Sequence, residues 1–160
     1  MKKAGKILLL VLTVACLVNI FSNSLQNASS SSRQSGRVVQ FVSEFWQSLT
    51  GKAVHPDRIT NLIRKTAHFL EFALLGFLGT STAASFFGRV YGRVHTLLFW
   101  GLAAAVMDEF LQRFSRGRSP QVSDITLDFS GFVAGFAAAW LISAALARKR
   151  RQYEMGLSLD

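Results

Sequence analysis

The chain has 160 residues, half of them apolar, with two prolines, one cysteine and a formal net charge of +9. The apolar residues gather into four continuous blocks, which indicates a polytopic membrane protein and not a soluble domain. Cys16 has no partner in the chain, so an intramolecular disulfide framework is excluded, and the basic residues cluster beside the apolar blocks, which argues against nucleic-acid binding.

The first apolar block predicts a transmembrane helix over residues 6–25, close to the ~20 residues that a span needs. It follows Lys2 and Lys3, a pattern that is also typical of a signal peptide. Cleavage before Cys16 in "LTVAC" or within "SNSLQNA" would remove it. Because Leu12 is one residue too far from Cys16 for a lipoprotein signal and the apolar run continues past the cysteine, we expect the helix to be retained.

The segment after this helix begins with the Ser-rich "NASSSSRQSG", which is typical of a flexible linker. It continues as "VVQFVSEFWQSL", in which apolar residues recur at helical spacing. This pattern predicts an amphipathic helix lying in the membrane interface with Trp46 as an anchor, or, alternatively, a partly buried lid on the bundle. Its apolar face comprises Val38, Phe41, Val42, Phe45, Trp46 and Leu49.

Three further spans are predicted over residues 66–87, 94–111 and 125–147, followed by a basic tail over 148–160. The connector "GRVYGRVH" is short, so the second and third spans should form a helical hairpin. The predicted fold is therefore all-α: a single membrane domain over residues 1–160 with four transmembrane helices and one interfacial helix.

The orientation follows from the position of basic residues, because their simple count is a tie between the two sides. Lys2, Lys3 and Lys6 abut the first helix, and the run "RKRR" closes the last one. Since basic residues next to spans favour the cytoplasm, we expect both termini inside.

Charged residues are concentrated at one end of three predicted spans. Arg64, His68 and Glu71 fall within an arc of about 60° on one face of the second span. With the expected orientation, the acidic and amide residues of the other two spans lie in the same outer half of the membrane. The sequence therefore predicts one polar layer at a single depth in the membrane. Besides Arg64, His68 and Glu71, this layer contains Lys65, Asp108, Glu109, Gln112, Arg113, Arg116, Arg118, Asp124 and Asp128.

Some of these residues also have simpler interpretations. Asp124 could cap the fourth helix, and the loop arginines could be interfacial anchors. Glu71 and Asp128 lie inside spans, where an unpaired charge is costly and ionisable residues are candidates for function. We expect Glu71 to lie within reach of a basic group, namely Arg64, Arg116 or Arg118. "GFVAG", with Gly131 and Gly135, indicates close helix packing.

The stretches "RKTAHFLEFALLGFLG" and "DEFLQRFSRGRSPQVSDITLDFSGFVAG" resemble the VanZ-like family of small bacterial membrane proteins, whose namesake is associated with teicoplanin resistance. The resemblance covers about residues 64–135, and "FSNS" is similar to a serine-rich stretch of the family. Phe72 stands where tyrosine is common, and Asp128 where asparagine is common, which adds a negative charge suited to a cation or a shared proton. The family pattern falls on Arg64, Lys65, His68, Glu71, Asp108, Glu109, Gln112, Arg118, Asp124, Asp128 and Gly131.

The resemblance implies a place, the bacterial cytoplasmic membrane, and a process, envelope resistance. We expect membrane lipids as partners and an anionic or lipid-linked molecule, such as a wall precursor or a lipoglycopeptide, as the ligand. Arginine and lysine suit its anionic oxygens, which favours contacts from Arg64, Lys65, Arg116 and Arg118. The acidic residues would hold these cations in place.

Three other functions stay open. An enzyme could use His68 and Glu71 as an acid/base pair with Asp108 nearby, although no nucleophile is evident. A divalent cation could bind Asp108, Glu109 and Asp128. Scattered carboxylates are only a weakly specific signature of a metal site, so no metal or cofactor is assigned. A proton-coupled transporter could use His68, Glu71 and Asp128, and a structural partner of another envelope protein would need the polar layer only for folding.

Overall fold

The computed structural model contains four long helices. No β-strand occurs among the residues that the structure describes. The structure describes residues 3–26, 36, 39–41, 43–45, 47–48, 56–88, 91–115 and 121–156. Each long helix is apolar enough to cross a membrane, so the all-α, four-span architecture is confirmed. The helices are α1 (Lys3–Ser24), α3 (Pro56–Phe87), α4 (Val94–Gln112) and α5 (Val122–Gly156), with a short 3₁₀ turn, η1 (Tyr91–Arg93), before α4.

Two helices extend beyond their predicted spans. The second span was predicted to begin at residue 66, whereas α3 begins at Pro56, a residue that suits the first turn of a helix. The fourth was predicted to end at residue 147, whereas α5 continues to Gly156 through the basic run. Apolar periodicity defines only the part of a helix inside the membrane, so polar extensions of the same helices escape it.

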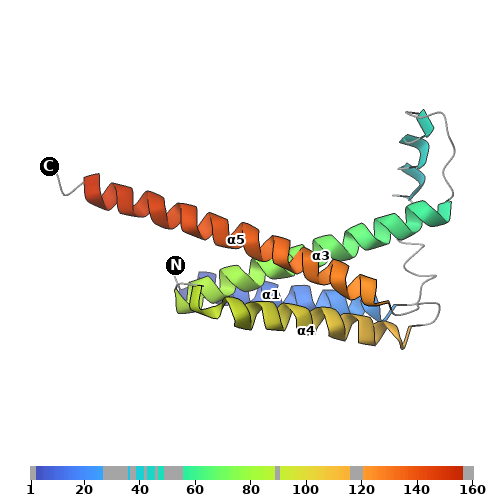
Figure 1. The fold of residues 1–160 in the computed structure, drawn as a ribbon, viewed down its shortest axis with the longest axis horizontal. Helices are drawn as coiled ribbons and strands as arrows, with labels where there is room; N and C mark the ends of the chain where they lie inside the picture. Colours follow the sequence, from blue (N-terminus) through green and yellow to red (C-terminus); the bar gives the residue numbers. More distant parts are fainter. Residues whose placement is uncertain are drawn as a thin grey trace.

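The strongest packing in the bundle is between α3 and α5, which cross near their middles (Figure 1). A Cβ atom on Gly131 would collide with the Phe69 carbonyl, and one on Gly135 with the Ala73 carbonyl. The two backbones are therefore in direct contact, as small residues allow between membrane helices. The predicted packing role of "GFVAG" is confirmed.

The connection between α3 and α4 is short, as predicted. Gly88 has φ +76°, and its N–H donates to the Ala84 carbonyl at 3.0 Å, which is the left-handed ending that glycine favours at a helix C-terminus. The two helices nevertheless diverge after this turn (Figure 1), and α4 packs more against α5 and α1 than against α3.

In the predicted interfacial segment, residues 39–41, 43–45 and 47–48 are helical. Phe41 and Phe45 are 70% and 57% exposed and stack on each other with centroids 6.5 Å apart. This exposure favours the interfacial position over a buried lid. The other residues of the predicted apolar face, Val38, Val42, Trp46 and Leu49, lie outside the described part of the chain.

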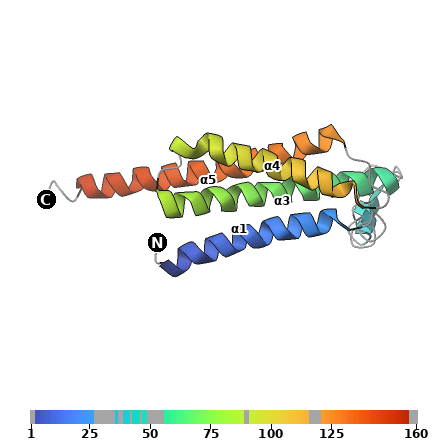
Figure 2. The ribbon, with the colours of Figure 1, turned by 90° about the horizontal axis from the view of Figure 1, so that it is seen from below.

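The chain order places the polar ends of α1 and α4 beside the polar starts of α3 and α5, at one end of the bundle. α1 and α4 end where α3 and α5 begin, while the start of α1 and the end of α5 lie at the opposite end (Figure 1). Because successive helices run in opposite directions, the start of α1 and the end of α5 lie at the same end of the bundle (Figure 2). Between the two ends lies a core of Ile20, Phe72, Leu75, Ala105, Phe132 and Phe136.

Candidate functional site

Polar side chains from all four helices meet where α1 and α4 end. Several of them are at most 7% exposed, which is unusual for ionisable and amide groups. We call the following residues the polar cluster: Asn23, Ser24, Lys65, His68, Glu71, Asp108, Glu109, Gln112, Asp124 and Asp128.

Asp108 is the centre of the polar cluster and is fully buried. Its Oδ1 accepts a hydrogen bond from Ser24 Oγ at 2.6 Å, and its Oδ2 accepts one from Gln112 Nε2 at 3.1 Å. His68 Nδ1 lies 3.8 Å from the same Oδ2. The carboxylate therefore joins α1, α3 and α4, and it is oriented by neutral donors.

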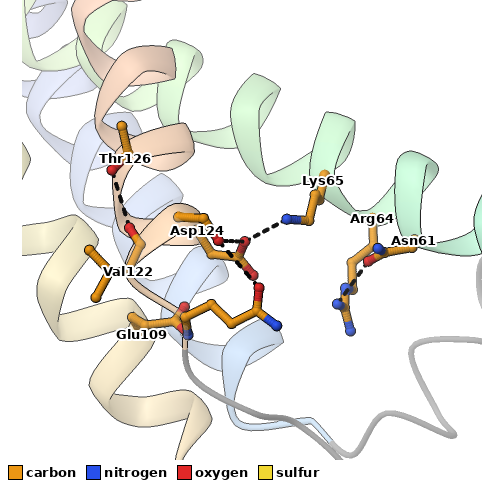
Figure 3. A network of polar contacts seen from close by, with 9 residues as sticks. Asn61, Arg64, Lys65, Glu109, Val122, Asp124 and Thr126 are labelled. Atoms are coloured by element: carbon orange, nitrogen blue, oxygen red, sulfur yellow. Dashed lines mark hydrogen bonds and ion pairs between the residues drawn. The ribbon is translucent and has the colours of Figure 1, made fainter.

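Glu71 contacts the first helix, and its expected pairing with a basic group stays a prediction. Its Oε1 accepts a hydrogen bond from Asn23 Nδ2 at 2.9 Å, so the carboxylate reaches α1. Arg64 instead donates to Asn61 on its own helix at 3.1 Å (Figure 3). The arc of about 60° shared by Arg64, His68 and Glu71 spans the boundary between the α1 side and the α5 side of α3. Arg116 and Arg118, the other expected partners, lie outside the described residues.

Lys65 and Asp124 form an ion pair between α3 and α5. Lys65 Nζ lies 2.7 Å from Asp124 Oδ1, with the two side chains 34% and 18% exposed (Figure 3). Ser123 Oγ lies 3.3 Å from the same oxygen. At this exposure the pair contributes at most about 1 kcal/mol to stability, and Asp124 holds the lysine in position at the edge of the cluster.

Glu109 closes the cluster on the side of the α4–α5 connection. It is 4% exposed, and its Oε1 accepts the backbone N–H of Gln121, just before α5. This bond ties the end of α4 to the start of α5. Glu109 therefore has a structural role in addition to the predicted site role.

Asp128 lies on α5, one turn after Asp124, and is 1% exposed. Neither of its carboxylate oxygens has a hydrogen-bond partner among the described residues. One side-chain ligand atom each from His68, Asp108 and Asp128 lies within 4.8 Å of the others. A buried carboxylate without a donor requires a proton or a cation.

The structure has a polar pocket at the polar cluster and an apolar pocket among the four helices. The first is polar and small, about 10 Å³, which is room for about one water-sized particle. It is lined by Arg64, Lys65, His68, Gln112, Asp124, Leu127 and Asp128. The second, about 350 Å³, is almost wholly apolar and lies among the four helices, with Phe21, Leu75, Trp100, Met107 and Phe132 in its wall.

The predicted convergence of three spans is largely found. Lys65, His68, Asp108, Gln112, Asp124 and Asp128 come together. The contribution of α1, where Asn23 and Ser24 hydrogen-bond two of the carboxylates, was not predicted. Polar residues in "FSNS", at the end of an otherwise apolar run, were the available signal.

A family model described as VanZ/LLP1 matches residues 7–143, a range that includes most of all four helices and the whole polar cluster. No curated protein and no solved structure matches the chain.

Proposed function

The chain belongs to the VanZ/LLP1 family, and from this premise we propose that it binds an anionic or lipid-linked cell-envelope molecule in the outer half of the bacterial cytoplasmic membrane. The observation that carries the proposal is the presence, in one bundle, of a buried polar cluster and of an apolar pocket lined by all four helices. Met107, in the wall of the apolar pocket, directly precedes the buried Asp108. A single amphiphilic molecule could occupy both environments.

The cationic edge of the cluster suits an anionic head group. Arg64 and Lys65 line the polar pocket together with His68, and both basic side chains are partly exposed. Arginine presents a fork of donors that matches phosphate or carboxylate oxygens, and lysine adds a point charge. Asp124 positions Lys65 for this contact without covering it.

The apolar pocket suits an acyl or isoprenoid chain. Its volume of about 350 Å³ lies within the range of ligand pockets. Trp100 in its wall is 66% exposed, so the pocket opens toward the lipid side of the bundle. A hydrocarbon tail could therefore enter laterally from the membrane while the head group stays at the polar end.

This placement also supports a contribution to glycopeptide resistance. Teicoplanin carries an acyl chain and acts on a lipid-linked wall precursor, so either molecule combines the two properties that the site would recognise. The proposal places both termini in the cytoplasm, since the basic residues near Lys3 and in "RKRR" lie at the end opposite the cluster.

A second candidate function is catalysis on such a lipid or precursor. The observation that favours it is the 3.8 Å approach of His68 Nδ1 to Asp108 Oδ2, which is an acid/base arrangement close to hydrogen-bond reach. Glu71 bonds Asn23, so Asp108 is the better partner for His68 than the Glu71 of the sequence-based hypothesis.

The binding proposal is tested with the purified chain in detergent and lipids of known charge. Wild type should bind an anionic phospholipid at least about tenfold more tightly than phosphatidylcholine, equivalent to about 1.4 kcal/mol, and Lys65→Ala should lose most of that preference. Arg93→Ala is the matched control, because Arg93 stacks over Phe87 at the other end of the bundle. Equal affinity for both lipids would refute the proposal.

A further inference from the structure

We propose that His68, Asp108 and Asp128 form a binding site for one divalent transition-metal ion, enclosed by α3, α4 and α5 at the inner end of the polar pocket. The three residues come from three different helices and converge only in the folded bundle. The site goes beyond the lipid-binding function and does not depend on it.

The primary observation is the state of Asp128. At 1% exposure both of its oxygens lack a donor among the described residues, although a buried charge is normally paired and hydrogen-bonded. Lys65, a cationic residue in the same pocket, is already bound to Asp124 at 2.7 Å. A metal ion would satisfy both the charge and the lone pairs of Asp128.

The geometry is close to that of a coordination shell. Metal–nitrogen and metal–oxygen bonds of about 2.0–2.2 Å place ligand atoms about 3–4 Å apart. His68 Nδ1 and Asp108 Oδ2 are already 3.8 Å apart, and the three ligand atoms all lie within 4.8 Å of one another. Small side-chain rotations would bring the third ligand into range.

The outer contacts of Asp108 resemble the support that metal ligands usually have. Ser24 fixes Oδ1 at 2.6 Å and Gln112 contacts Oδ2 at 3.1 Å, and such hydrogen bonds orient a ligating carboxylate. The oxygen that faces His68 keeps a further lone pair for an ion. The ligand is thus held in place before any ion arrives.

The charges around the pocket also favour a cation. Arg64 and Lys65 line the pocket and oppose it, but among the described residues the acidic groups in this region are more numerous: Asp108, Glu109, Asp124 and Asp128. One imidazole and two carboxylates suit Zn²⁺ or Mn²⁺ better than Mg²⁺ or Ca²⁺, which prefer all-oxygen shells. Three protein ligands would leave a coordination position open toward the basic side chains.

The test is a direct count of bound metal on the full-length chain in detergent. After chelator treatment and dialysis against micromolar Zn²⁺ or Mn²⁺, mass spectrometry of the eluted metal should find about one ion per chain. Asp128→Asn should weaken binding at least tenfold in calorimetry. Glu44→Gln, which removes an exposed carboxylate outside the polar cluster, should bind the ion as wild type does.

If Asp128→Asn does not give a folded protein, His68→Gln is the second variant to test. It should also lose the ion. The site is refuted if wild type binds no stoichiometric ion, if His68→Gln or folded Asp128→Asn retains full affinity, or if Mg²⁺ binds as tightly as Zn²⁺ and Mn²⁺. Lipid affinity measured on the same samples separates this outcome from failure of the proposed lipid-binding function.

Discussion

Ser24 and Asp108, which are 84 positions apart, are joined by a 2.6 Å hydrogen bond between two fully buried side chains. Ser115 Oγ donates to the Ser24 carbonyl at 2.6 Å, so the end of α1 is also tied to the segment after α4. The first helix is therefore an integral wall of the polar cluster and not merely a membrane anchor.

Replacing Ser24 with alanine should destabilise the bundle by about 1–3 kcal/mol, because Asp108 Oδ1 would lose its donor in a buried environment. The free energy of unfolding in a denaturant titration measures this. Ser22→Ala is the matched control, since Ser22 lies on the same helix and is exposed. Equal stability of the two variants would show that the bond makes no net contribution.

Asn23 and Glu71 should be energetically coupled. Asn23→Ala removes a donor from the Glu71 carboxylate, and hydrogen bonds to charged groups are worth about 1.5–3 kcal/mol. A double-mutant cycle with Glu71→Ala should therefore give a coupling energy of about 1 kcal/mol or more. Strict additivity of the two substitutions would contradict the contact between α1 and α3.

Gly135→Leu should prevent normal packing of α3 against α5, because even a Cβ atom at this position would collide with the Ala73 carbonyl. We expect loss of most folded, monodisperse protein in size-exclusion chromatography. Gly79→Leu is the control, since no atom lies within 4 Å of a Cβ built there. If both variants elute as wild type does, the close crossing of the two helices is wrong.

Topology at the polar end can be tested by labelling. A cysteine introduced at the exposed Ser123 of the Cys16→Ala protein should react with a membrane-impermeant maleimide in intact cells, because the proposal places this end outside. A cysteine at Gln152, near the end of α5, should react only after lysis. The reverse pattern would invert the proposed orientation.

Most of the fold was predictable because each span carries its own apolar signal. The convergence of His68, Asp108 and Asp128 also followed from sequence, since charges inside spans must face one another or water. The partner of Glu71 did not follow, because helical periodicity gives a direction on α3 but not which neighbour lies there. Asn23 is neutral and ends an apolar run, so it carried little signal of its own.

The same limit applies to the state of Asp128. The sequence shows only that the Asp128 carboxylate lies inside a span. The folded bundle shows in addition that Lys65 forms an ion pair with Asp124 and that Asp128 lacks a donor among the described residues. Competition between acidic residues for one cation depends on distances that spacing along a helix does not define.

The most direct test of the central claim, that the polar cluster is a functional site, is teicoplanin susceptibility of a sensitive bacterium that expresses each variant at equal level. Wild type and Arg93→Ala should raise the inhibitory concentration, whereas Lys65→Ala and Arg64→Ala, which remove the cationic side chains that line the polar pocket, should give no protection. Equal protection by all four proteins, or none by wild type, would contradict the account.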